Sequence, residues 1–233
     1  MADLPTDWPI YLYIPNLIGY ARVIANSVAV SVAFTNKTVF ATLYLISFIC
    51  DELDGRFARV LNQRSTFGAV LDMVTDRVST ASLLVLLTHF YKSWFALFLG
   101  LLALDISSHW FQVYGTFLAS KTSHKDMADS KSSLLRLYYR QRFFMGYCAI
   151  GSEVLYLLLY MLGTTESAGN TPLSPLGVIQ AAVEDRKSVF GILLVAAIPG
   201  WAIKQIVNIV QMKTAADVCV QFDIERHAPP KDD

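Results

Sequence analysis

The stretch DELDGRFARVLNQRSTFGAVLDMVTD, residues 51–76, places five acidic side chains in segments that otherwise have the composition of apolar helices. Residues three, four and seven apart lie on one face of a helix. This spacing predicts one stripe on each of two helices, made of Asp51, Asp54, Gly55 and Ala58 on the first and of Gly68, Asp72 and Asp76 on the second. Because only eight residues separate Arg59 from Gly68, the helices are expected to form an antiparallel hairpin whose stripes face each other.

Four carboxylates that meet in this way repel one another and resist ionisation unless they share a cation. The candidate ligands are Asp51, Asp54, Asp72 and Asp76. A ligand set made only of oxygen atoms suits Mg²⁺ or Mn²⁺ rather than zinc. Two such ions, about 4 Å apart, can activate a hydroxyl and neutralise phosphate charge during an in-line displacement. The stretch therefore predicts a centre of two Mg²⁺ or Mn²⁺ ions.

The small residues of the two stripes predict a binding slot beside the carboxylates. Gly55 and Gly68 have no side chain, so a bulky anionic substrate has room to approach both helix backbones, and Ala58 keeps the same stripe shallow. Arg59 follows directly, and its planar fork of donors suits a diphosphate.

Composition outside this stretch predicts a membrane protein. Of the 233 residues, 54% are apolar, and the mean hydropathy is +0.43. The formal net charge is zero, so no overall basic field indicates nucleic acid as a partner. The three cysteines are far apart and form no Cys-x-x-Cys pair, which argues against a zinc site or a disulfide framework.

Six apolar stretches are long enough to cross a bilayer, which takes roughly 20 residues of helix. The expected fold is an all-α polytopic membrane protein, with a single domain over residues 1–233. Residues 1–15 are expected to lie in the membrane interface, because residues 8–14 are short, rich in aromatic side chains and followed by Pro15. Residues 214–233 are expected to form a cytoplasmic tail. The six predicted spans are 16–34, 39–59, 67–90, 94–118, 143–162 and 188–212.

The placement of Lys and Arg predicts the orientation of these spans, since short cytoplasmic loops are enriched in both residues. The loops after the second and fourth spans and the C-terminal tail hold most of the cations near the membrane. Both termini and the acidic cluster are therefore expected to face the cytoplasm. The segment 164–187, rich in Gly, Ser and Pro, is expected to be a lumenal loop.

Two other readings of the acidic cluster remain open at this point. The acids could form ordinary ion pairs at helix ends, with Arg56, Arg59, Arg64 and Arg77 as the available partners. They could instead form the binding site of a divalent-cation transporter, although a transporter is expected to place polar pathway residues near the middle of the bilayer. Glu52 lies off the stripe, which favours a solvated or paired role for it.

The pattern Asp-x2-Asp-Gly-x2-Ala-Arg-x8-Gly-x3-Asp-x3-Asp resembles the signature of the CDP-alcohol phosphatidyltransferases at every fixed position. Further segments resemble the eukaryotic phosphatidylinositol synthases within that family: PNLIGYAR at residues 15–22, SSHW at 107–110, SHK at 123–125 and LRLYY at 135–139. The resemblance implies a six-helix membrane fold, a homodimer, and location in the endoplasmic reticulum or the Golgi.

The resemblance also implies a reaction, in which CDP-diacylglycerol and myo-inositol give phosphatidylinositol and CMP. By analogy with the family, Asp51, Asp54 and Asp72 would hold the metals, and Asp76 would complete the site and act as the base. Gly55, Ala58 and Gly68 would line the nucleotide slot, and Arg59 would bind the diphosphate. Glycerol phosphate, choline or ethanolamine remain alternative acceptors, because the signature does not separate them.

Two further groups of residues are candidate substrate contacts. Asn16 and Arg22, near the start of the first span, are candidates for the lipid phosphate of CDP-diacylglycerol, although helix capping and snorkelling explain them as well. Inositol is uncharged and polyhydroxylated, so its pocket needs hydrogen-bonding groups at the cytoplasmic mouth. Lys125, Arg136 and Arg142 are candidates, although the bias of cytoplasmic loops toward cations also accounts for them.

Overall fold

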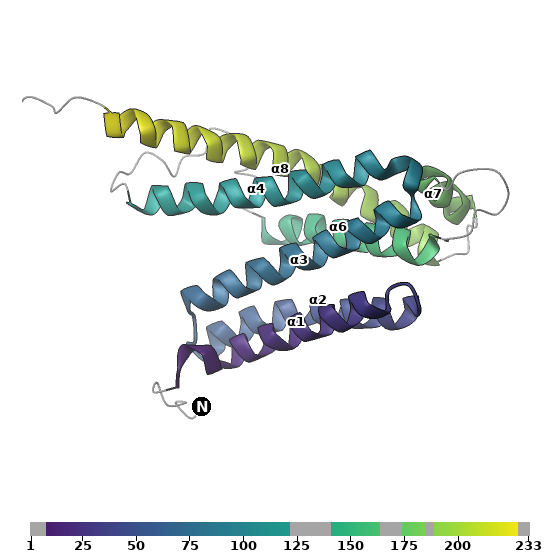
Figure 1. Ribbon diagram of the computed structural model, residues 1–233, viewed down its shortest axis with the longest axis horizontal. Coiled ribbons are helices and arrows are strands. Elements are labelled where there is room, and N and C mark those ends of the chain that lie inside the picture. The colour runs from purple at the N-terminus through teal and green to yellow at the C-terminus, as the bar shows by residue number, and fades with distance from the viewer. Residues whose placement is uncertain (1–7, 122–140, 164–173, 185–188, 228–233) are drawn as a thin grey trace, which may run out of the picture. The chain divides into compact units, whose positions relative to one another are not determined.

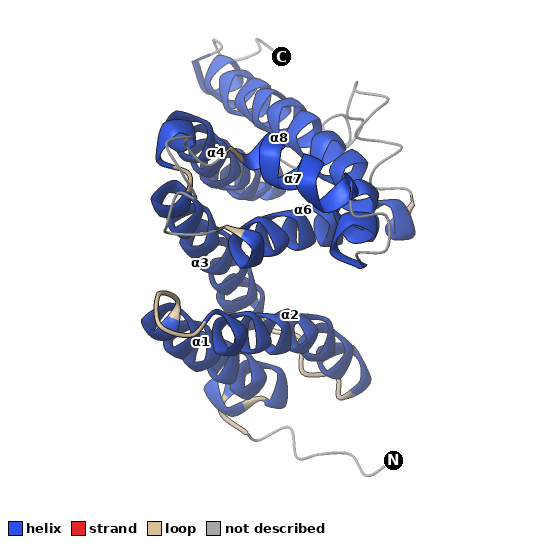
Figure 2. Cartoon of the chain, turned by 90° about the vertical axis from the view of Figure 1, so that its right-hand side faces the viewer, coloured by secondary structure: helices blue, strands red, loops and turns tan. Residues whose placement is uncertain are grey.

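The structure, a computed structural model, describes residues 8–121, 141–163, 174–184 and 189–227, and all regular elements in these ranges are helices (Figures 1 and 2). They form two compact units, which are described separately. The first unit contains the described residues of Met1–Leu86 together with Tyr160–Leu162. The second unit contains the described residues of Leu87–Leu159 and of Gly163–Asp233. In chain order the elements are η1 (Ile10–Leu12), α1 (Ile14–Val32), α2 (Lys37–Val60), α3 (Thr66–Phe90), η2 (Lys92–Trp94), α4 (Phe95–Lys121), α6 (Arg142–Leu162), α7 (Pro175–Glu184) and α8 (Val189–His227).

A helix is present at each of the six predicted spans. Three stretches in the described residues are long and apolar enough to cross a membrane, namely Lys92–Ala119, Phe143–Leu162 and Val189–His227. Polar and charged side chains make α1, α2 and α3 less apolar. The all-helical class is therefore confirmed for the described residues, whereas the count of six spans stays a prediction.

The second half of the chain contains more helix than the sequence suggested. Helix α7 lies within the segment expected to be a loop, and its first residue, Pro175, suits the first turn of a helix. Helix α8 continues through the expected tail as far as His227. Pairs of residues four apart, such as Lys213 with Asp217 at 2.9 Å, support this extension after the apolar run has ended.

In the first unit, α1 and α2 lie side by side (Figure 1). Their connection packs against the end of α6 through Tyr160, whose ring centroid lies 4.3 Å from that of Phe40. The Tyr160 hydroxyl donates to the carbonyl oxygen of Ala33 at 2.6 Å, and Lys37 Nζ donates to the Tyr160 carbonyl at 3.0 Å. These contacts fix the end of the α1–α2 hairpin that lies away from the acidic cluster.

The turn between α2 and α3 fixes the other end of this unit. Asn62 adopts a left-handed backbone conformation with φ of 53°, and the next amide, that of Gln63, donates back to the Ala58 carbonyl at 3.0 Å, which ends α2. Ser65 Oγ accepts from the Gly68 amide at 2.9 Å and caps the start of α3. The buried Gln63 Oε1 also accepts from the first amide of α1, that of Ile14, at 2.9 Å.

In the second unit, α4 packs along α8, and α6 packs against α8 through small residues. A Cβ atom added at Gly151 would lie 3.4 Å from the Cα atom of Gly200, so the α6 and α8 backbones approach each other closely. Pro199 interrupts the hydrogen bonds of α8, and the hydroxyl of Tyr147 donates to the Ala196 carbonyl at 2.7 Å in the turn before it.

Candidate active site

The four aspartates of the sequence pattern meet around one side chain, Arg22 of α1. Its Nη1 donates to Asp54 Oδ2 at 2.8 Å and to Asp72 Oδ1 at 2.7 Å. Its Nη2 pairs with Asp51 Oδ1 at 2.7 Å and donates to Asp76 Oδ1. The predicted stripes of α2 and α3 therefore do face each other, and a third helix supplies a cation between them.

The carboxylates are close enough to share ligands. Asp51, Asp72 and Asp76 each offer one oxygen atom, and these atoms all lie within 4.8 Å of one another. Asp54 joins them through the Arg22 contact and is largely buried. One guanidinium carries a single positive charge, so it cannot neutralise four ionised carboxylates. The donor set, which contains only oxygen, fits a divalent cation of the Mg²⁺ or Mn²⁺ type.

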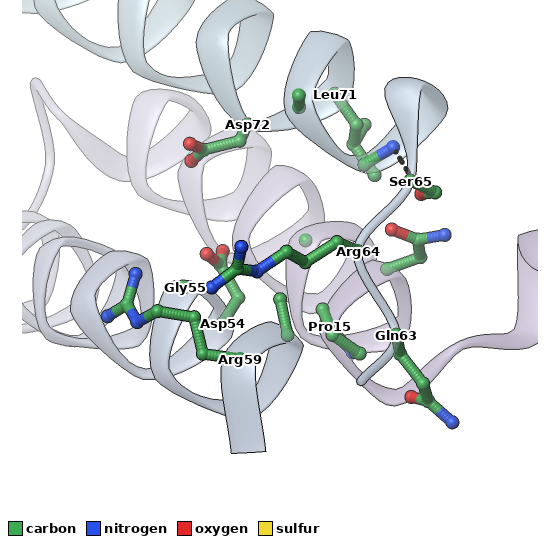
Figure 3. Close-up of a pocket in the computed structure, with 14 residues that line it drawn as sticks. Pro15, Asp54, Gly55, Arg59, Gln63, Arg64, Ser65, Leu71 and Asp72 are labelled. Atoms are coloured by element: carbon green, nitrogen blue, oxygen red, sulfur yellow. Dashed lines mark hydrogen bonds between the residues drawn. The ribbon is translucent and has the colours of Figure 1, made fainter. Parts of the chain in front are cut away.

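A pocket of about 340 Å³ opens beside this cluster, within the range of small-ligand sites. Two of the cluster's carboxylates, Asp54 and Asp72, lie in its wall on the facing helices α2 and α3 (Figure 3). The wall also contains the predicted slot residues Gly55, Ala58 and Gly68, together with Arg59, the candidate for the diphosphate, and Asn16, a candidate for the lipid phosphate. The pocket and the carboxylate cluster are therefore adjacent parts of one site.

Two exposed arginines, Arg59 and Arg64, also line the pocket. Arg64 extends from the turn before α3 toward α2 (Figure 3). Within the described residues, neither guanidinium has an ion-pair partner. Both are thus available to an anion that enters the pocket, and a guanidinium matches the geometry of phosphate oxygens.

The two glycines of the pattern are in different surroundings. A Cβ atom added at Gly68 would lie 2.6 Å from Oδ1 of Asn16, whose side chain is 1% exposed. Packing of α1 against α3 therefore explains Gly68. A Cβ atom added at Gly55 would meet only the Arg59 side chain, at an ordinary 3.5 Å. Packing within the described residues therefore does not require a glycine at position 55. The place of Gly55 in the pocket wall gives the reason for its small size.

The other predicted contacts have mixed outcomes. Asn16 lines the pocket, whereas Arg22 is 2% exposed and is engaged with the carboxylates, so its contact with a lipid phosphate stays a prediction. Lys125 and Arg136 lie outside the described residues, as does the side chain of Arg142, the first residue of α6.

The ion-pair alternative is confirmed in part, because the four aspartates do pair with an arginine, although it is Arg22 of α1. Arg56 pairs with Glu52 at 2.8 Å instead, so Glu52 is paired, as its position off the stripe suggested. That alternative did not include Arg22, which contacts all four aspartates, but it did include Arg77, which interacts electrostatically with Asp76.

Three residues of the turn before α3 line the pocket, although the sequence analysis named only one of them, Arg64, and only as a possible ion-pair partner of the acids. Gln63, Arg64 and Ser65 lie in the pocket wall, within the eight-residue spacer of the pattern. A sequence signal exists for Ser65, because serine is a preferred N-cap residue whose side chain accepts from the amide three residues later, here that of Gly68. The bond from Gln63 to α1 has no such local signal.

Comparison with known proteins decides the family. The family model described as CDP-alcohol phosphatidyltransferase matches residues 12–165, which includes α1, α2, α3 and the whole carboxylate cluster. The chain belongs to the CDP-alcohol phosphatidyltransferase family. Together with its apolar helices, this membership makes the chain an integral membrane protein.

Curated relatives match over nearly the whole chain. The protein named probable CDP-diacylglycerol–inositol 3-phosphatidyltransferase 2 of Arabidopsis thaliana is 56% identical over 97% of this chain and 98% of its own length. CDP-diacylglycerol–inositol 3-phosphatidyltransferase of Saccharomyces cerevisiae is 39% identical over 91% of this chain and 87% of its own. The protein of that name from Homo sapiens is 35% identical over 80% and 89%. No solved structure matches the chain.

Proposed function

We propose that this protein transfers the phosphatidyl group of CDP-diacylglycerol to myo-inositol, giving phosphatidylinositol and CMP. One observation carries the proposal: the converging carboxylates of α2 and α3 form part of the wall of a pocket that also presents Arg59 and Arg64, whose guanidinium groups have no ion-pair partner within the described residues. Metal ligands and phosphate donors that share a pocket suit displacement at phosphorus. The acceptor, inositol, comes from the names of the relatives.

The carboxylates and Arg59 divide the chemistry between them. Asp51, Asp54, Asp72 and Asp76 hold two Mg²⁺ or Mn²⁺ ions, which when bound neutralise phosphate charge and lower the pKa of a hydroxyl that they contact. Asp76 takes the proton of the attacking inositol hydroxyl. Arg59 donates to the diphosphate, and CMP is the leaving group. The family membership leaves no observation in favour of the divalent-cation transporter.

The pocket wall provides the substrate contacts. Gly55, Ala58 and Gly68 leave space for the nucleotide along α2 and α3, and Asn16 of α1 lines the same pocket, with its amide nitrogen donating to the Ile10 carbonyl. Lys125, Arg136 and Arg142 are the proposed contacts of inositol. The homodimer, the six spans, the cytoplasmic active site and the location in the endoplasmic reticulum belong to the same proposal.

A panel of acceptors tests the choice of substrate. Purified protein is supplied with CDP-diacylglycerol carrying a labelled acyl chain, with Mn²⁺, and with inositol, glycerol phosphate, choline or ethanolamine in separate reactions. We expect labelled phosphatidylinositol and CMP in equal amounts with inositol, and no product with the other three alcohols. Product with another alcohol and none with inositol would contradict the proposal.

The contrast between Gly55 and Gly68 gives a prediction with a built-in control. Gly55→Ala is expected to stabilise α2 by up to about 1 kcal/mol, because alanine favours helix more than glycine does. Its methyl group enters the slot, so KM for CDP-diacylglycerol is expected to rise by about tenfold or more. Gly68→Ala is expected to destabilise the protein by about 1–3 kcal/mol through its clash with Asn16. Thermal unfolding in detergent and steady-state kinetics measure both effects, and a stable Gly55→Ala protein with unchanged KM would remove Gly55 from the slot.

A further inference from the structure

Arg22 contacts the four aspartates in a regular way. Each terminal nitrogen of the guanidinium bridges one carboxylate of α2 and one of α3: Nη1 bridges Asp54 and Asp72, and Nη2 bridges Asp51 and Asp76. The contacts thus link the two helices twice through a single cation. A pair of divalent ions shared among the same residues would link them in the same sense.

The charge of this arrangement is unbalanced. Arg22 is 2% exposed, and its Nε atom has no hydrogen-bond partner among the described residues. Its one positive charge faces four carboxylates, so the cluster still carries excess negative charge when all four are ionised. Removing the arginine would leave carboxylates from two helices close together without the cation that contacts all four of them.

The Arg22 contacts use only one of the two oxygen atoms of each carboxylate. Arg22 engages one oxygen of each carboxylate, namely Oδ1 of Asp51, Asp72 and Asp76 and Oδ2 of Asp54. The side chains of Asp51, Asp72 and Asp76 are 32%, 44% and 34% exposed, whereas Arg22 is buried on the side of α1. A metal ion therefore has access to the cluster from the open side, opposite the arginine.

We propose that Arg22 is a positioning residue that holds the four carboxylates together when no metal is bound. It does so by neutralising part of the negative charge that the metal ions would otherwise neutralise. This inference rests on the proposed function, because it takes the cluster to be a metal site. Arginine and metal then stabilise the same arrangement and repel each other. The two are therefore coupled with opposite sign: each weakens the benefit of the other.

The test measures stability and metal affinity rather than turnover. Arg22→Met is purified in Mn²⁺ and then unfolded by heat in detergent, once with 1 mM Mn²⁺ and once with excess EDTA, beside the wild type. In EDTA we expect a drop in Tm of about 10 °C, because a buried charge partner is lost. In Mn²⁺ we expect less than half of that drop. Calorimetric titration with Mn²⁺ is expected to show binding about tenfold tighter than in the wild type.

Matched variants separate this role from simple packing. Arg22→Lys keeps the charge but lacks the fork of donors that bridges both helices, so we expect a drop in Tm in EDTA that is smaller than that of Arg22→Met. Arg22→Lys replaces Arg22→Met in the test if Arg22→Met cannot be purified. Adding Asp51→Asn to Arg22→Met is expected to recover part of the stability lost in EDTA. Arg56→Met removes an exposed ion pair and is expected to change Tm in neither condition.

The outcomes are distinguishable. An equal loss of stability with and without Mn²⁺ means that Arg22 is a structural partner only, and it overturns the inference while the metal site stands. Weaker Mn²⁺ binding in Arg22→Met overturns it as well. If Mn²⁺ neither binds nor stabilises the wild type, the proposed function fails, and the inference fails with it.

Discussion

Replacing Asp76 with asparagine is expected to lower the rate of CMP release in the presence of inositol by about 10³-fold or more. The variant keeps the size of the side chain but removes both its charge and its ability to take a proton. Loss of a positioned base costs about 10²–10⁴-fold, and loss of a metal-ligand charge adds to this. The measurement is CMP release from CDP-diacylglycerol at saturating Mn²⁺, with and without inositol.

A matched control separates chemistry from charge. Glu52→Gln removes an acid beside Asp51 in α2 whose ion-pair partner among the described residues is the exposed Arg56, so its rate is expected to stay within about twofold of the wild type. The folded state of Asp76→Asn is checked by its unfolding temperature in Mn²⁺. If the variant is folded and turns over at the wild-type rate, Asp76 is not the base, and another group must take the proton.

The spacing of the acids predicted the most important part of the site. Steps of three and four residues placed Asp51 with Asp54 and Asp72 with Asp76, and the short connection brought the two pairs together. The structure shows this convergence directly, through the contacts of each pair with Arg22. Helix periodicity is a local rule, and it succeeded here because every participant lies within 26 residues.

The same rule could not predict the partner of the acids. Arg22 is separated from Asp54 by 32 residues and from Asp76 by 54, and its position depends on how α1 packs against α3. That packing rests on close contacts such as the one between Gly19 and Leu71, where an added Cβ atom would lie 2.8 Å from Leu71 Cδ2. Contacts of this kind are decided by tertiary packing, about which the spacing along one helix carries no information.

Helix boundaries were predictable where polarity changes sharply and not elsewhere. The starts and ends of α2 and α3 agree with the predicted spans to within about two residues. In the structure the side chains of Asn36 and Ser65 accept from amides of the first turn and cap the starts of these helices. The prediction ended the last helix at residue 212, where its apolar run stops, whereas α8 continues on a polar surface to His227. Hydropathy measures the preference for a membrane and does not detect a helix that extends beyond it.

Removal of divalent cations is the second large effect that we expect. Excess EDTA should abolish CMP release, because without the ions the diphosphate loses most of its neutralising charge and the inositol hydroxyl keeps an ordinary pKa, which is too high for Asp76 to take its proton efficiently. Added Mg²⁺ or Mn²⁺ should restore turnover. Ca²⁺ should restore little of it, because it binds oxygen at 2.3–2.6 Å with 6–8 ligands, whereas Mg²⁺ requires about 2.0–2.1 Å and six. EDTA saturated beforehand with Mg²⁺ is the control, and it should leave the rate unchanged.

The same experiment tests the role of Arg22 in holding the carboxylates together without metal. Loss of turnover in EDTA with the wild-type protein still folded is the result expected if Arg22 holds the carboxylates in place without the ions. If the wild type unfolds as soon as the ions are removed, the arginine alone does not hold the cluster together. Turnover that persists in EDTA, with bound metal measured below the concentration of protein, would mean that the cluster is an ion-pair network around Arg22, and that the phosphatidyl group is transferred without a metal.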